Sequence, residues 1–295
     1  MKKVLFTGTG VAIVTPFATD GNVNYELLEK LIDFQIENGT DAIIICGTTG
    51  ESSTLSHEEH AATIKLAVDY VAGRVPVIAG TGSNDTAYAI KLSNEAEAAG
   101  VDGLLIVTPY YNKTSQDGLI AHYNFIADRV STPIITYNVP SRTGMNILPE
   151  TYYELSRHAK IVGAKEANGD ISALARTISL CGDDLAMYTG NDDQITAFMS
   201  LGAKGVISVI ANILPLETHQ IAMKYLEGDA LGSAALQIKF LDLCNDLFVD
   251  VNPVCCKEAL NMMGWPVGPC RMPLAPLNEK NRAKLNATLK KHGLV

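Results

Sequence analysis

The residue best suited to covalent chemistry is Lys165, which ends a short apolar segment at residues 161–164. Lysine is rarely buried in a strand unless it is paired or has lost its charge. One interpretation is that the side chain extends from the strand end and places its amine in water. The other is a buried, neutral amine that attacks a carbonyl carbon and forms a Schiff base. The segment alone leaves both interpretations open.

Polar and aromatic side chains also follow the other predicted strands, at the point where each strand ends. Tyr137 ends the strand that precedes the one with Lys165, and alternation places both side chains on one face if that face points inward. A phenol beside an amine can move protons onto and off a carbinolamine, so the pair suits imine chemistry. Gly163 shares this face, and we expect it to leave room beneath the amine.

Two further features can bind carboxylates. Thr48 and Thr49 lie between Gly47 and Gly50, where backbone N–H groups and hydroxyls can hold a small anion. Arg142 offers a planar fork for a second carboxylate. Each also has a simpler interpretation, since Gly/Thr loops are often only turns and a loop arginine is often only solvated.

Other chemistries receive little support from the predicted strand ends. They carry no cluster of His, Cys and carboxylate residues with metal-ligand spacing, and no histidine base for a nucleophilic serine. None of the six cysteines forms a CxxC pair, and we interpret the adjacent Cys255 and Cys256 as buried small hydrophobic residues.

Composition limits the class of protein and its partners. Of 295 residues, 47% are hydrophobic and 19% are charged, as in ordinary soluble globular proteins. The net charge of −9 and the absence of a Lys/Arg run argue against nucleic acid as a partner. No segment approaches the 18 apolar residues of a membrane span, and glycines and Pro16 interrupt the apolar N-terminus. We therefore expect a cytoplasmic protein that does not bind membranes.

Eight short segments rich in Val and Ile alternate with segments of helical periodicity, as expected for parallel strands covered on both faces. The predicted strands are residues 11–15, 42–46, 75–79, 103–108, 134–138, 161–165, 185–189 and 205–209. This pattern predicts a (β/α)8 barrel, whose catalytic groups lie at the carboxyl ends of the strands. A doubly wound sheet is disfavoured because no GxGxxG motif follows the first strand.

Several polar residues are placed to cap predicted helices. Asn24 precedes a helix over residues 25–38, and Ser56 opens the next helix with a capping box. Asn84 and Asn191 have the same position before two later helices.

The strand pattern stops after residue 209, and helical periodicity continues. The expected helices are residues 214–226, 230–248, 253–263 and 279–292. We therefore predict a catalytic barrel over residues 1–212 and a helical extension, packed on the barrel, over residues 213–295.

Six motifs occur in an order that resembles a known family. They are GTTGES (47–52), VTPYYN (107–112), YNVPSRTG (137–144), GAKEANGD (163–170), GNDD (190–193) and GVISVIAN (205–212). Together they resemble the 4-hydroxy-tetrahydrodipicolinate synthases, formerly called dihydrodipicolinate synthases, in the pyruvate-dependent class I aldolase family. The resemblance runs from about residue 5 to the C-terminus.

The resemblance implies condensation of pyruvate with L-aspartate 4-semialdehyde, in the diaminopimelate route to L-lysine, without a metal or organic cofactor. Lys165 would form the imine with pyruvate. Tyr137 would exchange protons, linked through Thr48 to Tyr111 of a neighbouring subunit. The remaining implied contacts are Thr49, Gly190 and Ile207 with pyruvate, and Arg142 with the carboxylate of the semialdehyde. The resemblance also implies a homo-oligomer, commonly a tetramer built as a dimer of dimers.

Two alternatives stay open beside the synthase. N-acetylneuraminate lyases and 2-keto-3-deoxysugar-acid aldolases share the lysine–tyrosine core, although residues 137–144 fit the synthase better. A non-catalytic binding or regulatory barrel is the alternative of a different class. The presence of a full set of catalytic residues argues against it.

The resemblance also implies an effector site for L-lysine at the interface of a tight dimer. Its matching residues are Ser52, Ser53, His57, His60, Asn84 and Tyr110. A glutamate of the family falls at position 88, where this chain has Tyr88, so the response to lysine is open. Residues 252–257 also depart from the family, and we interpret this departure as repacking within the extension.

Overall fold

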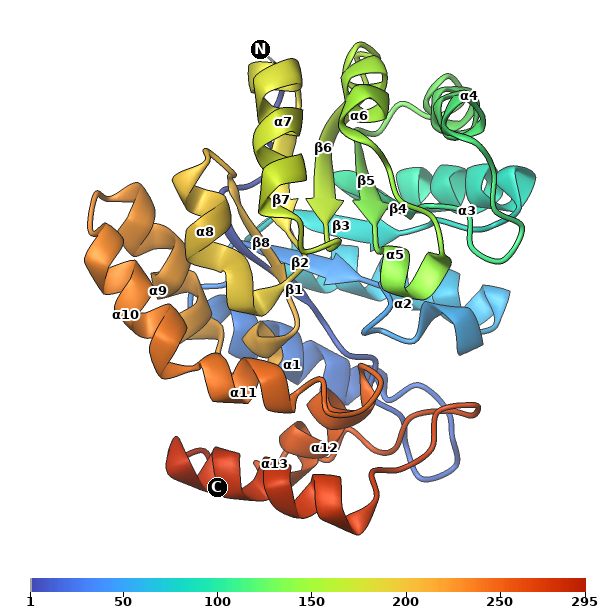
Figure 1. Ribbon diagram of the computed structural model, residues 1–295. Helices are drawn as coiled ribbons and strands as arrows, with labels where there is room; N and C mark the ends of the chain where they lie inside the picture. The colour runs from blue at the N-terminus through green and yellow to red at the C-terminus, as the bar shows by residue number, and fades with distance from the viewer. Residues whose placement is uncertain (1) are drawn as a thin grey trace.

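Eight parallel strands close into a barrel in chain order, with β8 pairing with β1 (Figure 1). The computed structural model describes residues 2–295. The strands are β1 (Gly8–Ala12), β2 (Ala42–Ile45), β3 (Val77–Gly80), β4 (Gly103–Val107), β5 (Ile134–Asn138), β6 (Ile161–Glu166), β7 (Ala186–Thr189) and β8 (Gly205–Ser208). Nearly all strand residues are buried, because side chains fill the barrel on one face and helices cover the other. The predicted (β/α)8 fold is confirmed.

Helices follow each strand and form the outer layer. They are α1 (Tyr25–Glu37), α2 (His57–Val71), α3 (Thr86–Ala99), α4 (Gln116–Ala127), α5 (Pro140–Thr143), α6 (Pro149–Ser156), α7 (Ile171–Cys181), α8 (Ile195–Ser200) and α9 (Pro215–Leu226). Short 3₁₀ turns are η1 (Ser52–Thr54), η2 (Gly182–Asp184), η3 (Asp192–Gln194) and η4 (Ile210–Asn212). Because α9 packs against β1 and β8, it takes the place of the eighth outer helix. The barrel therefore draws on residues beyond 212, and the division into two units at that residue stays a prediction.

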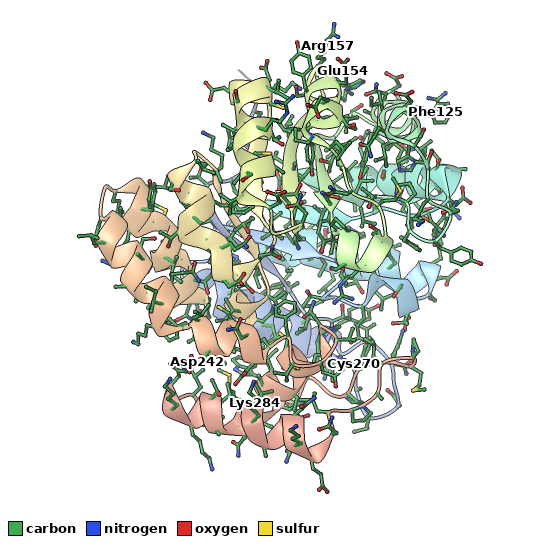
Figure 2. The ribbon with its side chains drawn as sticks, in the orientation of Figure 1. Phe125, Glu154, Arg157, Asp242, Cys270 and Lys284 are labelled. Atoms are coloured by element: carbon green, nitrogen blue, oxygen red, sulfur yellow. The ribbon has the colours of Figure 1, made fainter. Side chains whose placement is uncertain are left out.

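Most of the remaining C-terminal segment lies on the side of the barrel toward which the strands point. It contains α11 (Leu241–Asp246), α12 (Val254–Met262) and α13 (Glu279–Lys291), whereas α10 (Ala230–Lys239) packs against α8 and α9 in the outer layer. In Figure 1 the arrows of β5 and β6 point toward α5 and toward this part of the chain. Figure 2 labels Asp242, Cys270 and Lys284 there, on the side opposite α4 and α6. The extension therefore covers the end of the barrel where catalytic residues are expected.

The single helix predicted over residues 230–248 is wrong. It divides at Phe240, whose φ of −103° and ψ of 10° end α10, and α11 ends at Asp246. Phe240 is buried, and its ring lies 5.1 Å from the ring of His292. The break coincides with the packing of Phe240 against His292. Helical periodicity alone did not reveal the break.

The first strand is also displaced from the prediction, since it covers residues 8–12 rather than 11–15. Gly8 has a φ of +103°, and a Cβ there would lie 2.2 Å from Oδ2 of Asp41. A Cβ at Gly10 would lie 2.4 Å from Cδ1 of Ile44. Both glycines are part of the strand, and larger residues would not fit there because the neighbouring side chains lie too close. The third strand is displaced similarly, to residues 77–80.

Two of the four predicted helix caps are confirmed. Asn24 accepts a hydrogen bond from the N–H of Leu27, and Ser56 forms a capping box with Glu59. The prediction for Asn84 is wrong, because Asp85 caps α3 by accepting from the N–H groups of residues 87 and 88.

The predicted cap at Asn191 is wrong as well. A 3₁₀ turn, η3, separates this residue from α8, and no side-chain hydrogen bond caps that helix. The neighbouring Asp192 instead accepts hydrogen bonds from the N–H groups of Val209 and Ile210, at 3.0 and 2.8 Å. The acidic turn therefore joins the ends of β7 and β8.

Side chains fill the barrel below its mouth. The rings of Phe6 and Tyr188 stack with centroids 4.4 Å apart, and Ile44, Ile135 and Ile207 belong to the same buried cluster. Cys255 and Cys256 are buried, as interpreted from the sequence. Within residues 2–295 no helix is long and apolar enough to cross a membrane. Space for a ligand must therefore be sought at the mouth.

Candidate active site

Lys165 and Tyr137 are neighbours at the carboxyl ends of β6 and β5. The two residues pair in register, and Nζ of Lys165 lies 4.4 Å from the centroid of the Tyr137 ring. Both are buried, with 5% and 7% of their surface exposed. The predicted pair is therefore present, and the interpretation of a lysine extended into water is wrong.

Two glycines shape the space around the amine. A Cβ at Gly190 would lie 3.0 Å from Cε of Lys165, so a side chain there would displace the lysine. At Gly163, a Cβ would lie 2.9 Å from the carbonyl oxygen of Ala186 and 3.4 Å from the Tyr188 ring. The expectation that Gly163 leaves room beneath the amine of Lys165 is therefore wrong. That glycine accommodates β7 and its tyrosine, whereas Gly190 accommodates the lysine.

A cavity of about 430 Å³ opens at this position. Its walls contain Thr48, Thr49, Tyr137, Val139, Ser141, Arg142, Lys165, Ala167, Gly190, Asn191, Val209, Phe248, Asp250, Val251 and Asn252. The structure thus brings together six of the eight residues predicted for catalysis and substrate binding. Four of the wall residues come from the C-terminal extension, and none of these four was predicted.

Tyr111 and Ile207 are the two predicted residues that do not line this cavity. Tyr111 is 93% exposed and has a φ of +68°, so its side chain projects away from the protomer. Ile207 is completely buried within the barrel, and Val209 occupies the cavity wall beside β8. Thr48 lines the cavity, although no hydrogen bond joins it to Tyr137 within residues 2–295.

Asn252 is a site residue that the sequence reasoning missed. Its Nδ2 donates a hydrogen bond to Oγ1 of Thr49 at 2.9 Å, and its backbone oxygen accepts one from Arg142, also at 2.9 Å. The interpretation of residues 252–257 as mere repacking within the extension is therefore wrong. The departure from the family pattern was a usable signal, but nothing in the sequence placed Asn252 beside Arg142 and Thr49, which are 110 and 203 residues away.

Lys257, from the same segment, anchors the loop that carries the two threonines. Its Nζ lies 2.9 Å from Oε1 of Glu51, and it also donates to the backbone oxygens of Thr15 and Pro269. The other oxygen of Glu51 accepts a hydrogen bond from the N–H of Arg271. The loop after β2 is thus held from the extension by a buried ion pair.

A buried carboxylate, Glu166, fixes the strand ends next to Lys165 and Tyr137. It accepts hydrogen bonds from Nδ2 of Asn138, the Tyr152 hydroxyl at 2.8 Å and the N–H of Asn168 at 2.8 Å. Burial raises the pKa of Glu166 to about 7, although these hydrogen bonds oppose the rise. Glu166 and Asn138 directly follow Lys165 and Tyr137, so this contact sets the relative position of the pair.

Asp192 places a second buried carboxylate near the amine. Burial raises the pKa of Asp192, whereas hydrogen bonds from Ser208 and from the N–H groups at the end of β8 lower it. The charge of Lys165 acts in the same direction as these bonds.

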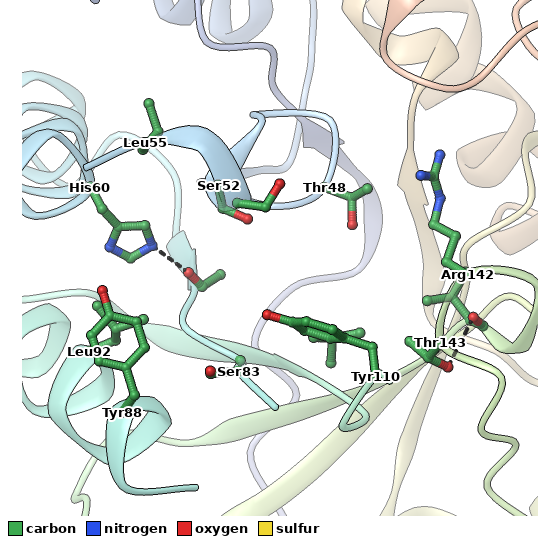
Figure 3. A pocket seen from close by; sticks show the side chains of 15 residues that line it. Thr48, Ser52, Leu55, His60, Ser83, Tyr88, Leu92, Tyr110, Arg142 and Thr143 are labelled. Atoms are coloured by element: carbon green, nitrogen blue, oxygen red, sulfur yellow. Dashed lines mark hydrogen bonds between the residues drawn. The ribbon is translucent and has the colours of Figure 1, made fainter. Parts of the chain in front are cut away.

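A second cavity, of about 380 Å³, shares Thr48 and Arg142 with the first (Figure 3). Ser52, Ser53, His60 and Tyr110, four of the predicted effector residues, line it, and so does Tyr88. Figure 3 shows His60 and Tyr88 on one side of this cavity and Thr48 and Arg142 on the other. No carboxylate side chain lies in its wall among the described residues.

The other two predicted effector residues do not line the second cavity. Nδ1 of His57 lies 3.4 Å from the Tyr88 hydroxyl, and its Nε2 lies 3.2 Å from Glu95. Asn84 uses its backbone oxygen to accept from Asn112. His60 lies 2.9 Å from the backbone oxygen of Gly80, and burial lowers the pKa of its imidazole.

The geometry defines a class of protein: a (β/α)8 barrel enzyme with a buried lysine and a tyrosine at its mouth, as in class I aldolases. The residues described contain no group of His, Cys, Asp and Glu arranged to hold a metal ion.

Comparisons with known proteins agree with this class. The model of the dihydrodipicolinate synthetase family matches residues 5–292. A 4-hydroxy-tetrahydrodipicolinate synthase of Thermoanaerobacter sp. strain X514 is 53% identical over 292 residues, which cover 99% of this chain and 98% of that protein.

Two solved structures show the same likeness. The chloride-inhibited dihydrodipicolinate synthase of Acinetobacter baumannii, complexed with pyruvate, is 43% identical with a TM-score of 0.96, over 98% of this chain and 99% of that one. The enzyme of Cyanidioschyzon merolae with lysine bound is 38% identical with a TM-score of 0.96, over 99% of this chain and 100% of that one.

The chain therefore belongs to the dihydrodipicolinate synthetase family. It is a lyase of lysine and diaminopimelate biosynthesis, and its function is that shared by these relatives, 4-hydroxy-tetrahydrodipicolinate synthesis. The predicted function is confirmed over the alternatives, which were an N-acetylneuraminate lyase, a 2-keto-3-deoxysugar-acid aldolase and a non-catalytic barrel.

Proposed function

We propose that this chain condenses pyruvate with L-aspartate 4-semialdehyde through a Schiff base on Lys165, without a metal or organic cofactor. The observation that carries the proposal is the position of the Lys165 amine, 4.4 Å from the centroid of the Tyr137 ring in the wall of a 430 Å³ cavity. Amine and phenol together supply the nucleophile and the proton carrier that imine formation requires.

The reaction proceeds in three stages. The amine of Lys165 attacks the keto carbon of pyruvate, and Tyr137 moves protons so that water leaves and the imine forms. Loss of a methyl proton gives the enamine, which attacks the aldehyde carbon of the second substrate. The amino group of that substrate then attacks the imine carbon, closes the ring and releases Lys165.

The carboxylates of the two substrates occupy different walls. Thr49 and Gly190 border the amine, so the pyruvate carboxylate lies against them. Arg142 is exposed at the rim but held by Asn252, and its guanidinium binds the carboxylate of the semialdehyde. Contact of pyruvate with Ile207 stays a prediction, since that side chain packs inside the barrel.

The exposed Tyr111 supports a homo-oligomer. In the proposed assembly it enters the cavity of a neighbouring subunit and completes a proton path through Thr48 to Tyr137. A tetramer built as a dimer of dimers provides such contacts. The six free cysteines support a cytoplasmic location.

L-lysine is a poor match for the second cavity. An amino acid with a cationic side chain requires a carboxylate or several carbonyl groups around its ammonium. In this chain Tyr88 replaces the family's glutamate, and Arg142 is the charged residue in the wall. We therefore infer that L-lysine does not inhibit this enzyme in the manner of glutamate-bearing relatives.

Reduction by borohydride tests the Schiff base. In the presence of pyruvate, the intact protein should gain one covalent adduct per chain, and peptide mapping should place it on Lys165. Lys165→Ala should form no adduct and lose turnover while keeping its fold. Lys65→Ala, which changes a lysine exposed on α2, should behave as wild type. Absence of an adduct in the wild-type protein would refute the proposed chemistry.

A further inference from the structure

The Asn252 side chain makes a single hydrogen bond within residues 2–295. Its Nδ2 donates to Oγ1 of Thr49, and its Oδ1, although buried, has no partner. Only 5% of Asn252 is exposed, and the residue lines the cavity that contains Lys165. A buried acceptor without a partner is costly, so a purely structural role for this amide is unfavourable.

The direction of this hydrogen bond determines what Thr49 can do. A threonine hydroxyl has one proton to donate and two lone pairs that accept. Because Nδ2 supplies a proton to one lone pair, the Thr49 proton is left free. The side chain of Thr49 makes no other hydrogen bond within the described residues. The hydroxyl can therefore donate into the cavity, toward an anion beside Lys165.

Asn252 also contacts the second binding group, through its main chain. Its backbone oxygen accepts from Nη2 of Arg142 at 2.9 Å. The side chain and the main chain of one residue thus contact the groups that we propose to bind the two different substrates. A substitution that changes the amide alone leaves the contact with Arg142 in place.

We propose that Asn252 is a positioning residue that directs the Thr49 hydroxyl toward the carboxylate of pyruvate. The inference rests on the proposed function, because it takes pyruvate as the ligand beside Lys165. It assigns a defined role in binding the first substrate to a residue of the C-terminal extension.

Asn252→Ala removes the hydrogen bond to Thr49. The concentration of pyruvate that gives half-maximal borohydride trapping, and KM for pyruvate, should rise about two- to tenfold, as expected for one lost hydrogen bond. KM for L-aspartate 4-semialdehyde should stay within about twofold of wild type, because the Arg142 contact involves the backbone. A general loss of structure would instead change both values.

A double-mutant cycle shows whether the effect passes through Thr49. In a Thr49→Val background there is no hydroxyl to direct, so adding Asn252→Ala should leave the pyruvate dependence unchanged. An equal fold-change in both backgrounds would overturn the proposal, because Asn252 would then act independently of Thr49.

Asn252→Asp preserves the shape of the side chain but replaces its donor with a carboxylate. The Thr49 proton would then bond to the aspartate, and the new charge would repel pyruvate. KM for pyruvate should rise more than in Asn252→Ala. Asn245→Asp makes the same change at an exposed residue of α11 and should leave KM unchanged.

Two failures are distinguishable. If the wild-type protein traps pyruvate and both Asn252 variants have the wild-type pyruvate dependence, the role of Asn252 is refuted while the Schiff base stands. If the wild-type protein traps no pyruvate, the proposed function fails, and this inference fails with it.

Discussion

Lys257 and Glu51 form an ion pair with an N–O distance of 2.9 Å, and 1% and 3% of these residues are exposed. Burial lowers the pKa of Lys257, although the charge of Glu51 opposes this effect. The pair joins α12 to the loop after β2, which carries Thr48 and Thr49. The stability of the extension and the shape of the cavity are therefore linked through it.

Lys257→Met should lower the free energy of unfolding by about 3–5 kcal/mol, because it leaves the buried carboxylate of Glu51 without its countercharge and two backbone oxygens without their donor. The measurement is urea unfolding. Lys284→Met breaks an ion pair between Asp246 and a lysine side chain that is 56% exposed, and it should cost at most about 1 kcal/mol. If the two variants lost similar amounts of unfolding free energy, the buried pair would contribute no more to stability than the exposed one.

The pKa of Glu166 should make stability depend on pH. Because the pKa is raised from 4.5 to about 7 in the folded state, the native protein binds more protons than the unfolded chain between these values. The contribution of Glu166 is therefore fully present below about pH 4.5 and decreases as pH rises through about 7. Thermal unfolding should show wild type losing stability relative to Glu166→Gln from pH 5 to pH 8.

The matched control for this prediction is Glu37→Gln, which changes an exposed glutamate at the end of α1. Its stability difference from wild type should be the same at both pH values. A pH-independent difference for Glu166→Gln would show that the carboxyl group keeps an ordinary pKa in the folded protein.

Hybrid oligomers should reveal whether Tyr111 acts in a neighbouring subunit. Tyr111→Phe and Lys165→Ala should each be nearly inactive alone. When the two variants are co-expressed, one site of each hybrid pair regains both residues, so activity should return. A mixture of Tyr137→Phe and Lys165→Ala has no such intact site, because those residues lie in the same protomer, and it should stay inactive. Activity that never exceeds the sum of the single variants would argue against a shared site.

The second cavity predicts an enzyme that is insensitive to L-lysine. Initial rates of wild type should not fall when lysine is added, because no carboxylate lines the described cavity. Tyr88→Glu supplies one and should introduce inhibition, whereas Tyr88→Gln, which adds an amide without a charge, should not. Strong inhibition of wild type would show that lysine binds without a carboxylate at position 88.

The strands and the proximity of Tyr137 and Lys165 could be predicted because both depend on local pattern. Continuous apolar segments indicated parallel strands, and the period of two placed Tyr137 and Lys165 on one face of neighbouring strands. The first strand begins earlier in the chain than predicted. Its glycines lie against Asp41 and Ile44, and composition does not reveal these contacts. Likewise, the turn at Asn191 satisfies backbone groups of β8 rather than a helix.

The far side of the cavity could not be predicted from pattern. Asn252 meets Thr49 and Arg142 only because the extension folds back over the barrel, and no periodicity encodes that path. Glu166 did carry a signal, since a carboxylate directly after an inward lysine must face the helix layer and requires several donors there. The role proposed for Tyr111 depends on another chain, so neither the sequence pattern nor one protomer could establish it.

The wall formed by residues 248–252 has a practical consequence for redesign. Strand residues such as Tyr137 carry the proposed chemistry, but Phe248, Asp250 and Val251 border the same cavity from outside the barrel. Mutant libraries confined to this segment can therefore explore bulkier or differently charged aldehydes while Lys165 and Tyr137 stay unchanged. In such libraries, position 252 should be kept as asparagine.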